Sequence, residues 1–226
     1  MRLMKETAPA APADPAADPV ADLAADLAAA RPVRSGPPLA PGADRYLALD
    51  LANSDLAFPG SRDVDLLGTP ESAREWLVTR ELAPAETVLY DVCAGRLRAL
   101  RDAVRALLSA RVEDAVAPAD AVRAVNDALT SAPSAALLHW DDVHGPYRAQ
   151  AHPIDQIVNH AIAVLAADAA DLLTAPDAAR LTPCGATPCR RFLVRTHASR
   201  QWCSTRCGDR VRAARAYARR TRGTAD

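Results

Sequence analysis

Four cysteines near the C-terminus form the strongest chemical pattern in the chain. Cys184 and Cys189 are separated by four residues, Cys203 and Cys207 by three, and thirteen residues lie between the two pairs. Each pair can supply two corners of a tetrahedral thiolate site, the arrangement that zinc prefers. Because four protein ligands leave no position open to water or substrate, the sequence predicts one structural zinc ion per chain and no catalytic metal.

Two alternatives remain for these cysteines: two disulfide bonds, or four separate buried thiols. The first residues carry Arg2 and Lys5 but no apolar segment, so we expect neither a secretory signal nor a membrane anchor. In a cytoplasmic chain, cysteines clustered in pairs hold a metal more often than they form disulfides, and we favour zinc. His197 lies between the pairs and could replace one thiolate, but we expect it to be a solvated turn residue.

The residues around the cysteines predict a small finger. The first pair would form a knuckle, and RRFLVRT would continue as a strand with Phe192 and Val194 on one face. A turn at 197–200 would bring the chain back as the other side of a hairpin, with Trp202 packing over the metal. Ser204 would cap the helix that follows, an arrangement similar to a treble-clef finger.

Arginines dominate this predicted helix. From Arg180 onward the chain holds twelve Arg and two acidic residues, a formal charge of +10, whereas the first 179 residues hold 15 basic and 26 acidic residues, a formal charge of −11. A local basic excess of this kind is the footprint of a nucleic-acid-binding module. The stripe predicted to face the metal comprises Cys207, Val211, Ala214 and Ala218. The candidate nucleic-acid contacts are Arg200, Arg206, Arg210, Arg212, Arg215 and Arg219.

The segment from Arg180 to Arg222 resembles a known finger. WCS at 202–204, CGDR at 207–210 and the arginine-rich helix after them are similar to the CGNR zinc finger, which closes a family of bacterial proteins proposed to regulate transcription. The four cysteines match that signature, as does Arg210. Asp209 stands where the family usually has Asn, which exchanges an amide for a carboxylate and removes a hydrogen-bond donor. The resemblance implies zinc as the cofactor and DNA as the partner.

The rest of the chain predicts a mainly helical domain behind a polar arm. Residues 1–42 are rich in Ala, Pro and Asp and predict a disordered arm. The run YLALDLANS from Tyr46 alternates leucines with smaller residues and predicts a strand. Helices are expected to begin after Thr69 and at Pro84, Pro118 and Pro153, and ALLHW and YRAQA predict a hairpin.

We therefore predict an α+β fold: a mainly helical N-terminal domain with a short strand and a hairpin, and a small C-terminal treble-clef-like zinc finger. The helices are expected to bury their apolar faces on one another and not on the finger. Their order, with YLALDLANS, PESAREWL, LRALRDAVRALL and VNDAL as the best-matching pieces, resembles the ABATE domain, a stress-induced regulatory domain found before the CGNR finger. We place the domain at residues 46–178 and the finger at 180–222.

The remaining polar residues and Cys93 give weaker indications of a functional site. Asn53 and Asp55 could line a ligand pocket, but we expect a polar turn after the first strand. Cys93 lies among apolar residues of a predicted helix and should behave as a small buried hydrophobe, with a redox role as the alternative. We expect structural or exposed roles, and no second metal site, for His139, His144, His152 and His160.

These features predict a zinc-dependent, DNA-binding transcription regulator in the cytoplasm, whose N-terminal domain senses an effector. An enzyme is not expected, because no Walker loop, dinucleotide fingerprint or HExxH pattern occurs. Two alternatives stay open: an RNA-binding finger, and a protein-interaction module that docks its basic helix on an acidic partner, including the acidic part of this chain. No membrane partner is expected, a homodimer is possible, and the effector is left open.

Overall fold

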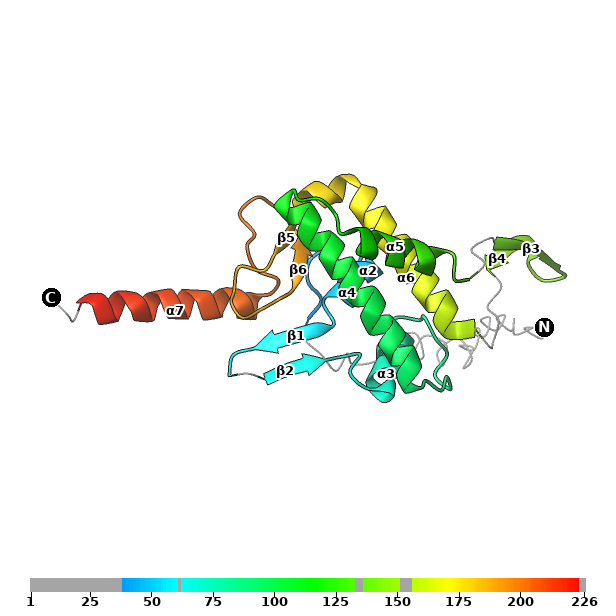
Figure 1. Cartoon of the computed structure of the whole chain (residues 1–226), viewed down its shortest axis with the longest axis horizontal. Helices are drawn as coiled ribbons and strands as arrows, with labels where there is room; N and C mark the ends of the chain where they lie inside the picture. Colours follow the sequence, from blue (N-terminus) through cyan, green and yellow to red (C-terminus); the bar gives the residue numbers. More distant parts are fainter. Residues whose placement is uncertain (1–37, 61, 133–135, 151–155, 224–226) are drawn as a thin grey trace, which may run out of the picture. The chain divides into compact units, whose positions relative to one another are not determined.

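The computed structural model describes residues 38–60, 62–132, 136–150 and 156–223 of the 226-residue chain (Figure 1). The helices are α2 (Leu47–Ala52), α3 (Pro70–Thr79), α4 (Asp91–Glu113), α5 (Ala119–Leu129), α6 (Ile157–Thr174), the 3-10 helix η2 (Pro176–Arg180) and α7 (Thr205–Gly223). The strands of the described residues form three antiparallel pairs: β1 (Asp55–Phe58) with β2 (Arg62–Asp65), β3 (Ala136–Asp141) with β4 (Gly145–Gln150), and β5 (Leu181–Pro183) with β6 (Phe192–Val194). This mixture of helices and small strand pairs confirms the α+β class.

Helices α4, α5 and α6 lie side by side (Figure 1), and their buried side chains belong to one apolar core. On α4, buried residues recur every three or four positions at Leu97, Leu100, Val104 and Leu108, the period of a helix with one face inside. By length and composition α6 could cross a membrane, but 44 % of its residues are buried inside the protein. Its apolar composition is explained by packing against α2, α4 and α5.

The run from Tyr46 is a helix, so the strand predicted there is wrong. The alternation of leucines with small residues suggested one buried face, but Ala48, Asp50 and Ala52 are buried as fully as the leucines. Leu and Ala favour helices, and no β-branched residue occurs in the run. The carboxylate of Asp168 on α6 accepts a hydrogen bond from the N–H of Ala48 at 2.7 Å and caps the short helix from outside.

The other predicted helices occur, with one late start. The helix expected from Pro84 begins only at Asp91, because the chain closes a turn in which the Thr87 N–H donates to the Pro84 carbonyl. Helix α3 begins after Thr69, whose hydroxyl accepts from the Ser72 N–H. Helix α5 and the β3–β4 hairpin lie where the sequence predicts them, and Pro153 lies outside the described residues.

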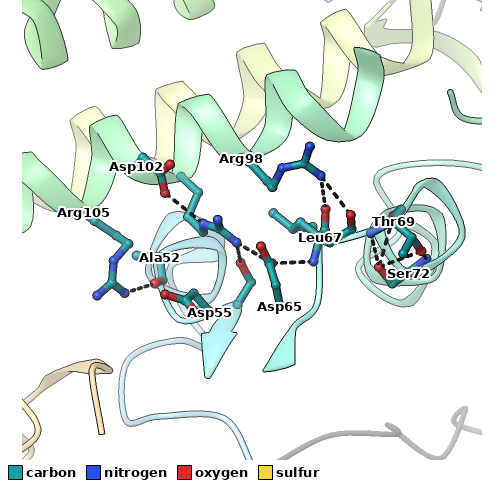
Figure 2. A network of polar contacts seen from close by, with 12 residues as sticks. Ala52, Asp55, Asp65, Leu67, Thr69, Ser72, Arg98, Asp102 and Arg105 are labelled. Carbon is teal, nitrogen blue, oxygen red and sulfur yellow. Dashed lines mark hydrogen bonds and ion pairs between the residues drawn. The ribbon is translucent and has the colours of Figure 1, made fainter. Parts of the chain in front are cut away.

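The β1–β2 hairpin was not predicted, because DLAF and RDVD are too short and polar to carry a strand pattern. Three arginines one turn apart on α4 contact the hairpin and the segments on either side of it (Figure 2). Arg101 pairs with Asp65 at 2.5 Å, Arg98 donates to the Leu67 carbonyl at 2.8 Å, and Arg105 donates to the Ala52 carbonyl at 2.5 Å. One face of α4 therefore holds the end of β2 by an ion pair and holds the residues before β1 and after β2 by hydrogen bonds to their carbonyls.

The finger's hairpin pairs differently from the prediction. Strand β6 pairs with β5, which precedes the first cysteine, and Gln201 and Trp202 form no strand. Leu181, Phe192 and Val194 all belong to the apolar core of the helices, so the expectation that the helices do not pack on the finger is wrong. These three side chains are buried against the helices, whereas Trp202 packs on the cysteine cluster.

Most of the predicted N-terminal arm, residues 1–37, lies outside the described residues. Its last five residues are described and pack on the finger. Ala40 is buried beside the cysteines, and the Pro41 carbonyl accepts from the Val194 N–H at 2.8 Å. Gly42 has φ 91°, and a Cβ there would lie 2.8 Å from the Val194 side chain, so only glycine fits.

Candidate metal centre

The four cysteines come together although the two pairs lie on different segments of the chain. Their sulfur atoms all lie within 4.8 Å of one another, with Cys189 Sγ 3.7 Å and Cys207 Sγ 3.6 Å from Cys203 Sγ. Zinc–sulfur bonds of about 2.3 Å to tetrahedral corners place neighbouring sulfurs roughly 3.8 Å apart. A disulfide needs a sulfur–sulfur distance of about 2.05 Å, and all five cysteines of the chain are free. The cluster fits one zinc ion.

The first pair sits on a knuckle at the tip of the β5–β6 hairpin. The Cys184 N–H donates to the Arg191 carbonyl and the Cys189 N–H to the Ala186 carbonyl, both at 2.8 Å, which closes the loop around the sulfurs. The Gly185 N–H donates to the Gln201 carbonyl at 2.9 Å and ties the knuckle to the segment before the second pair. The backbone, not side-chain packing, sets the positions of these two ligands.

The second pair lies at the start of α7, as the sequence predicts. Cys203 precedes the helix, and Cys207 lies in its first turn, where Ser204 Oγ accepts the Cys207 N–H at 3.3 Å. Trp202 packs on the cluster, and a Cβ at Gly208 would lie 3.1 Å from its ring, so a glycine here lets the ring lie close.

The sulfurs perturb one another's ionisation. Hydrogen bonds from Cys189 and Cys203 lower the pKa of the Cys184 thiol to about 2. The matching hydrogen bond to Cys184 raises the pKa of Cys189 to about 11 and also raises the pKa of Cys203. A metal that takes all four sulfurs as thiolates must displace such protons, so zinc binding to this cluster releases protons.

The histidines take no part in the cluster. His197 lies in an exposed turn, with its Nδ1 2.9 Å from Ser199 Oγ. Among the described residues, the four cysteines are the cluster that could hold a metal ion, and it includes no histidine. His139 stacks on Tyr147, His144 pairs with Asp141, and His160 is buried in α6. His152 lies outside the described residues.

The six candidate arginines fall into two environments. Arg206, Arg215 and Arg219 are exposed, and no side-chain hydrogen bond or ion pair joins any of them to another described residue. The other three are held: Arg200 Nε donates to the Trp202 carbonyl at 3.3 Å, Arg210 Nη2 to the Ala186 carbonyl at 2.6 Å, and Arg212 pairs with Asp209 at 2.5 Å. Their contact with nucleic acid stays a prediction.

The predicted metal-facing stripe of α7 is shorter than expected. Cys207 is buried and Val211 packs on the cluster, but Ala214 is exposed. The core around the cysteines is small, so it covers only the first turns of the helix. The remaining turns of α7 present exposed arginines.

Asn53 and Asp55 bind the finger and line no described cavity. Asn53 is 2 % exposed, and its amide donates to the Phe192 carbonyl at 2.9 Å while accepting the Phe192 N–H at 2.7 Å. Asp55 on β1, together with Asp63 on β2, pairs with Arg190, the residue after Cys189. The sequence offered one signal for this role, a polar Asn directly after an apolar run.

Four clustered cysteines held by a knuckle and a helix N-terminus define a zinc-finger protein. The sequence model of the ABATE family, described as "Putative stress-induced transcription regulator", matches residues 45–176, and that of the CGNR zinc finger matches residues 180–220. The chain belongs to the ABATE family and carries a CGNR zinc finger, which confirms both resemblances. No curated protein matches the chain. The four cysteines of the matched finger could hold one zinc ion, and the family description suggests a zinc-binding regulator.

Proposed function

We propose that the protein is a cytoplasmic transcription regulator that binds DNA through α7 and uses zinc only to fold the finger. The observation that carries this is the environment of Arg206, Arg215 and Arg219, which are exposed on a metal-anchored helix without an acidic partner among the described residues. Charge runs on protein surfaces are usually interspersed with acids, whereas this segment is strongly basic. No catalytic role is assigned, because all four metal positions are filled by thiolates.

The geometry of α7 suits duplex DNA. An α-helix fits the major groove, and arginines meet phosphates or fork to guanine edges. Arg215 and Arg219 are four residues apart and so lie on one side of the helix. The acidic remainder of the chain would repel DNA, which supports confining contact to the tail.

Binding titrations across a salt series test this. Arg215→Ala and Arg219→Ala should each weaken binding and reduce the slope of log affinity against log salt by about one unit. Arg123→Ala, an exposed arginine on α5, is the matched control and should leave both quantities unchanged. Affinity and slope that stay the same in both tail variants contradict the proposal. Tighter binding of competitor RNA favours the RNA-binding alternative, and the absence of any nucleic-acid affinity favours protein docking.

We propose in addition that the ABATE part senses a small effector. A cavity of about 1010 Å³ lies between the loop after α3 and the first turns of α4 and α6. This is the size of a small-molecule site, and apolar side chains form much of its wall. Among these are Leu82, Pro84, Val88, Ile157 and Val158.

The fluorescence of 1-anilinonaphthalene-8-sulfonate can report on this cavity. Val158→Phe should reduce binding of the probe by filling part of the space, whereas Val116→Phe, at an exposed position outside the cavity, should not. Sensing further requires that bound probe changes the affinity for DNA. Probe binding that is insensitive to Val158→Phe, or DNA affinity that is insensitive to the probe, contradicts a sensing role for this cavity.

A further inference from the structure

Two arginine side chains contact the sulfur cluster directly. Arg191 Nη1 lies 3.8 Å from Cys203 Sγ, and Arg210 Nη2 lies 3.9 Å from Cys207 Sγ. Arg191 is only 5 % exposed, and Arg210 is half-buried. These arginines therefore differ from the exposed ones on the later turns of α7.

Each of the two side chains crosses between the halves of the site. Arg191 follows the first cysteine pair in the chain, yet it reaches Cys203 of the second pair. Arg210 lies on the helix of the second pair, yet it donates to the Ala186 carbonyl inside the first knuckle at 2.6 Å. Arg191 also donates to the Pro38 carbonyl at 2.9 Å, which fastens the segment before Ala40 to the cluster. Both guanidinium groups thus join parts of the site that the sequence separates.

The charge of the site favours positively charged neighbours. Four thiolates around a divalent zinc ion leave two negative charges, and a buried charge is costly unless a partner offsets it. Two guanidinium groups supply two positive charges. No carboxylate among the described residues pairs with Arg191 or Arg210, and the Nε of each is buried without a hydrogen-bond partner. The thiolate cluster is the counter-charge that makes burial of these two arginines tolerable.

We propose that Arg191 and Arg210 are positioning residues of the zinc centre, which brace its two halves and neutralise its charge, and that Arg210 does not read DNA. The bracing and charge-neutralising roles rest on the zinc site and do not depend on the proposed DNA binding. It divides the arginines by role: the two beside the sulfurs retain the metal, whereas Arg206, Arg215 and Arg219 remain for nucleic acid.

Zinc release from the full-length, zinc-loaded protein to a chromogenic chelator tests the proposal. Groups that hydrogen-bond to metal ligands are typically worth about 10- to 100-fold in metal affinity, so Arg191→Ala and Arg210→Ala should weaken zinc binding by that factor. Arg210→Lys keeps the charge, but its ammonium nitrogen ends one bond short of Nη2, the atom through which Arg210 makes both contacts, so the variant should fall between wild type and Arg210→Ala. Arg215→Ala is the matched control on the same helix and should retain zinc like the wild type.

Substitution with Co²⁺ gives a second readout that a purely structural role would not move. Loss of an N–H···S contact should shift the thiolate-to-cobalt charge-transfer band of Arg210→Lys, while the d–d bands keep the pattern of four tetrahedral thiolates. Zinc affinity at the wild-type level in both alanine variants overturns the proposal. So does an Arg210→Lys charge-transfer band identical to wild type. A DNA affinity that falls in Arg210→Ala while zinc retention is unchanged would return Arg210 to the nucleic-acid contacts.

Discussion

The two faces of strand β6 enter two different cores. Phe192 and Val194 point into the apolar core of the helices, whereas Leu193 between them packs against the cysteines. The first core spans α2 to α6 and buries many large leucines. The second core has few buried residues, and all but one of them are alanines or cysteines: Ala40, Cys184, Ala186, Leu193, Cys203 and Cys207. One face of this three-residue strand therefore belongs to a core large enough to be stable without metal. The other face belongs to a core too small to be stable unless the cysteines bind a metal.

The finger itself is divided by this difference. Its β5–β6 hairpin is fixed by apolar burial and by Asn53, both independent of metal. Val211 on its helix α7, and Trp202 just before that helix, pack on the cysteine cluster. Metal should therefore matter much more to α7 than to the hairpin.

Loss of the metal should have the largest effect. Cys203→Ser combined with Cys207→Ser, or removal of zinc by a chelator, should unfold α7 and the knuckle, because structural zinc supplies the folding free energy of such small modules. The amides of the β5–β6 hairpin should stay protected from hydrogen exchange. Metal analysis and amide hydrogen exchange measure both results. Cys93→Ser, outside the cluster, is the control. A wild-type protein without stoichiometric zinc, or a double variant that keeps it, contradicts the four-thiolate site.

Truncation should separate the two halves of the finger. A chain that ends at residue 179 lacks the three side chains Leu181, Phe192 and Val194, and at about 1.5–3 kcal/mol each it loses roughly 5–9 kcal/mol of burial. That is comparable to the whole stability of an ordinary domain. A chain that ends at residue 195 keeps both strands. Thermal melts followed by circular dichroism should show a cooperative transition for the longer chain and a much lower or absent one for the shorter. Equal melting of both would mean that the helical core does not need the hairpin.

Asn53→Ala should act on the hairpin alone. It leaves the buried N–H and carbonyl of Phe192 without a partner, at a cost of about 2–4 kcal/mol. Asp55→Ala removes only a partly exposed pair with Arg190 and should cost less than about 1 kcal/mol. Urea denaturation compares the free energies of unfolding. A similar cost for the two variants would show that the amide is not the anchor of the hairpin.

Asp168→Asn should have the smallest effect, and it should stabilise. Burial raises the pKa of Asp168, so the folded protein holds this proton more tightly than the unfolded chain does. The ionised carboxylate thus lowers stability at neutral pH, and that loss is recovered as the pH falls through the folded-state pKa. Asn keeps the acceptor for the Ala48 N–H without the charge. The melting temperature of the variant should exceed that of wild type at neutral pH, with the difference shrinking in acid; a lower melting temperature at neutral pH contradicts this sign.

The sequence by itself determined the features that local chemistry controls. Cysteine spacing predicted the zinc ligands, Thr69 and Ser204 predicted helix starts, and alternation placed Phe192 and Val194 on one face. The charge division of the chain is also a property of sequence alone. Each of these depends on residues close together in the chain, so the pattern can be read without knowing the fold.

Tertiary structure decided the rest, because those outcomes depend on partners far away in the chain. The run from Tyr46 became a helix because all its sides are covered and Asp168 caps it. Strand β6 paired with β5 because the helices offered an apolar surface for both. Asn53 hydrogen-bonds to the backbone of Phe192, which is 139 residues away in the sequence. Arg210 contacts the Ala186 carbonyl and the sulfur of Cys207. The local sequence around an arginine on a helix does not reveal whether its side chain contacts DNA or a thiolate. For Arg210 that depends on where the fold places the knuckle of the first cysteine pair.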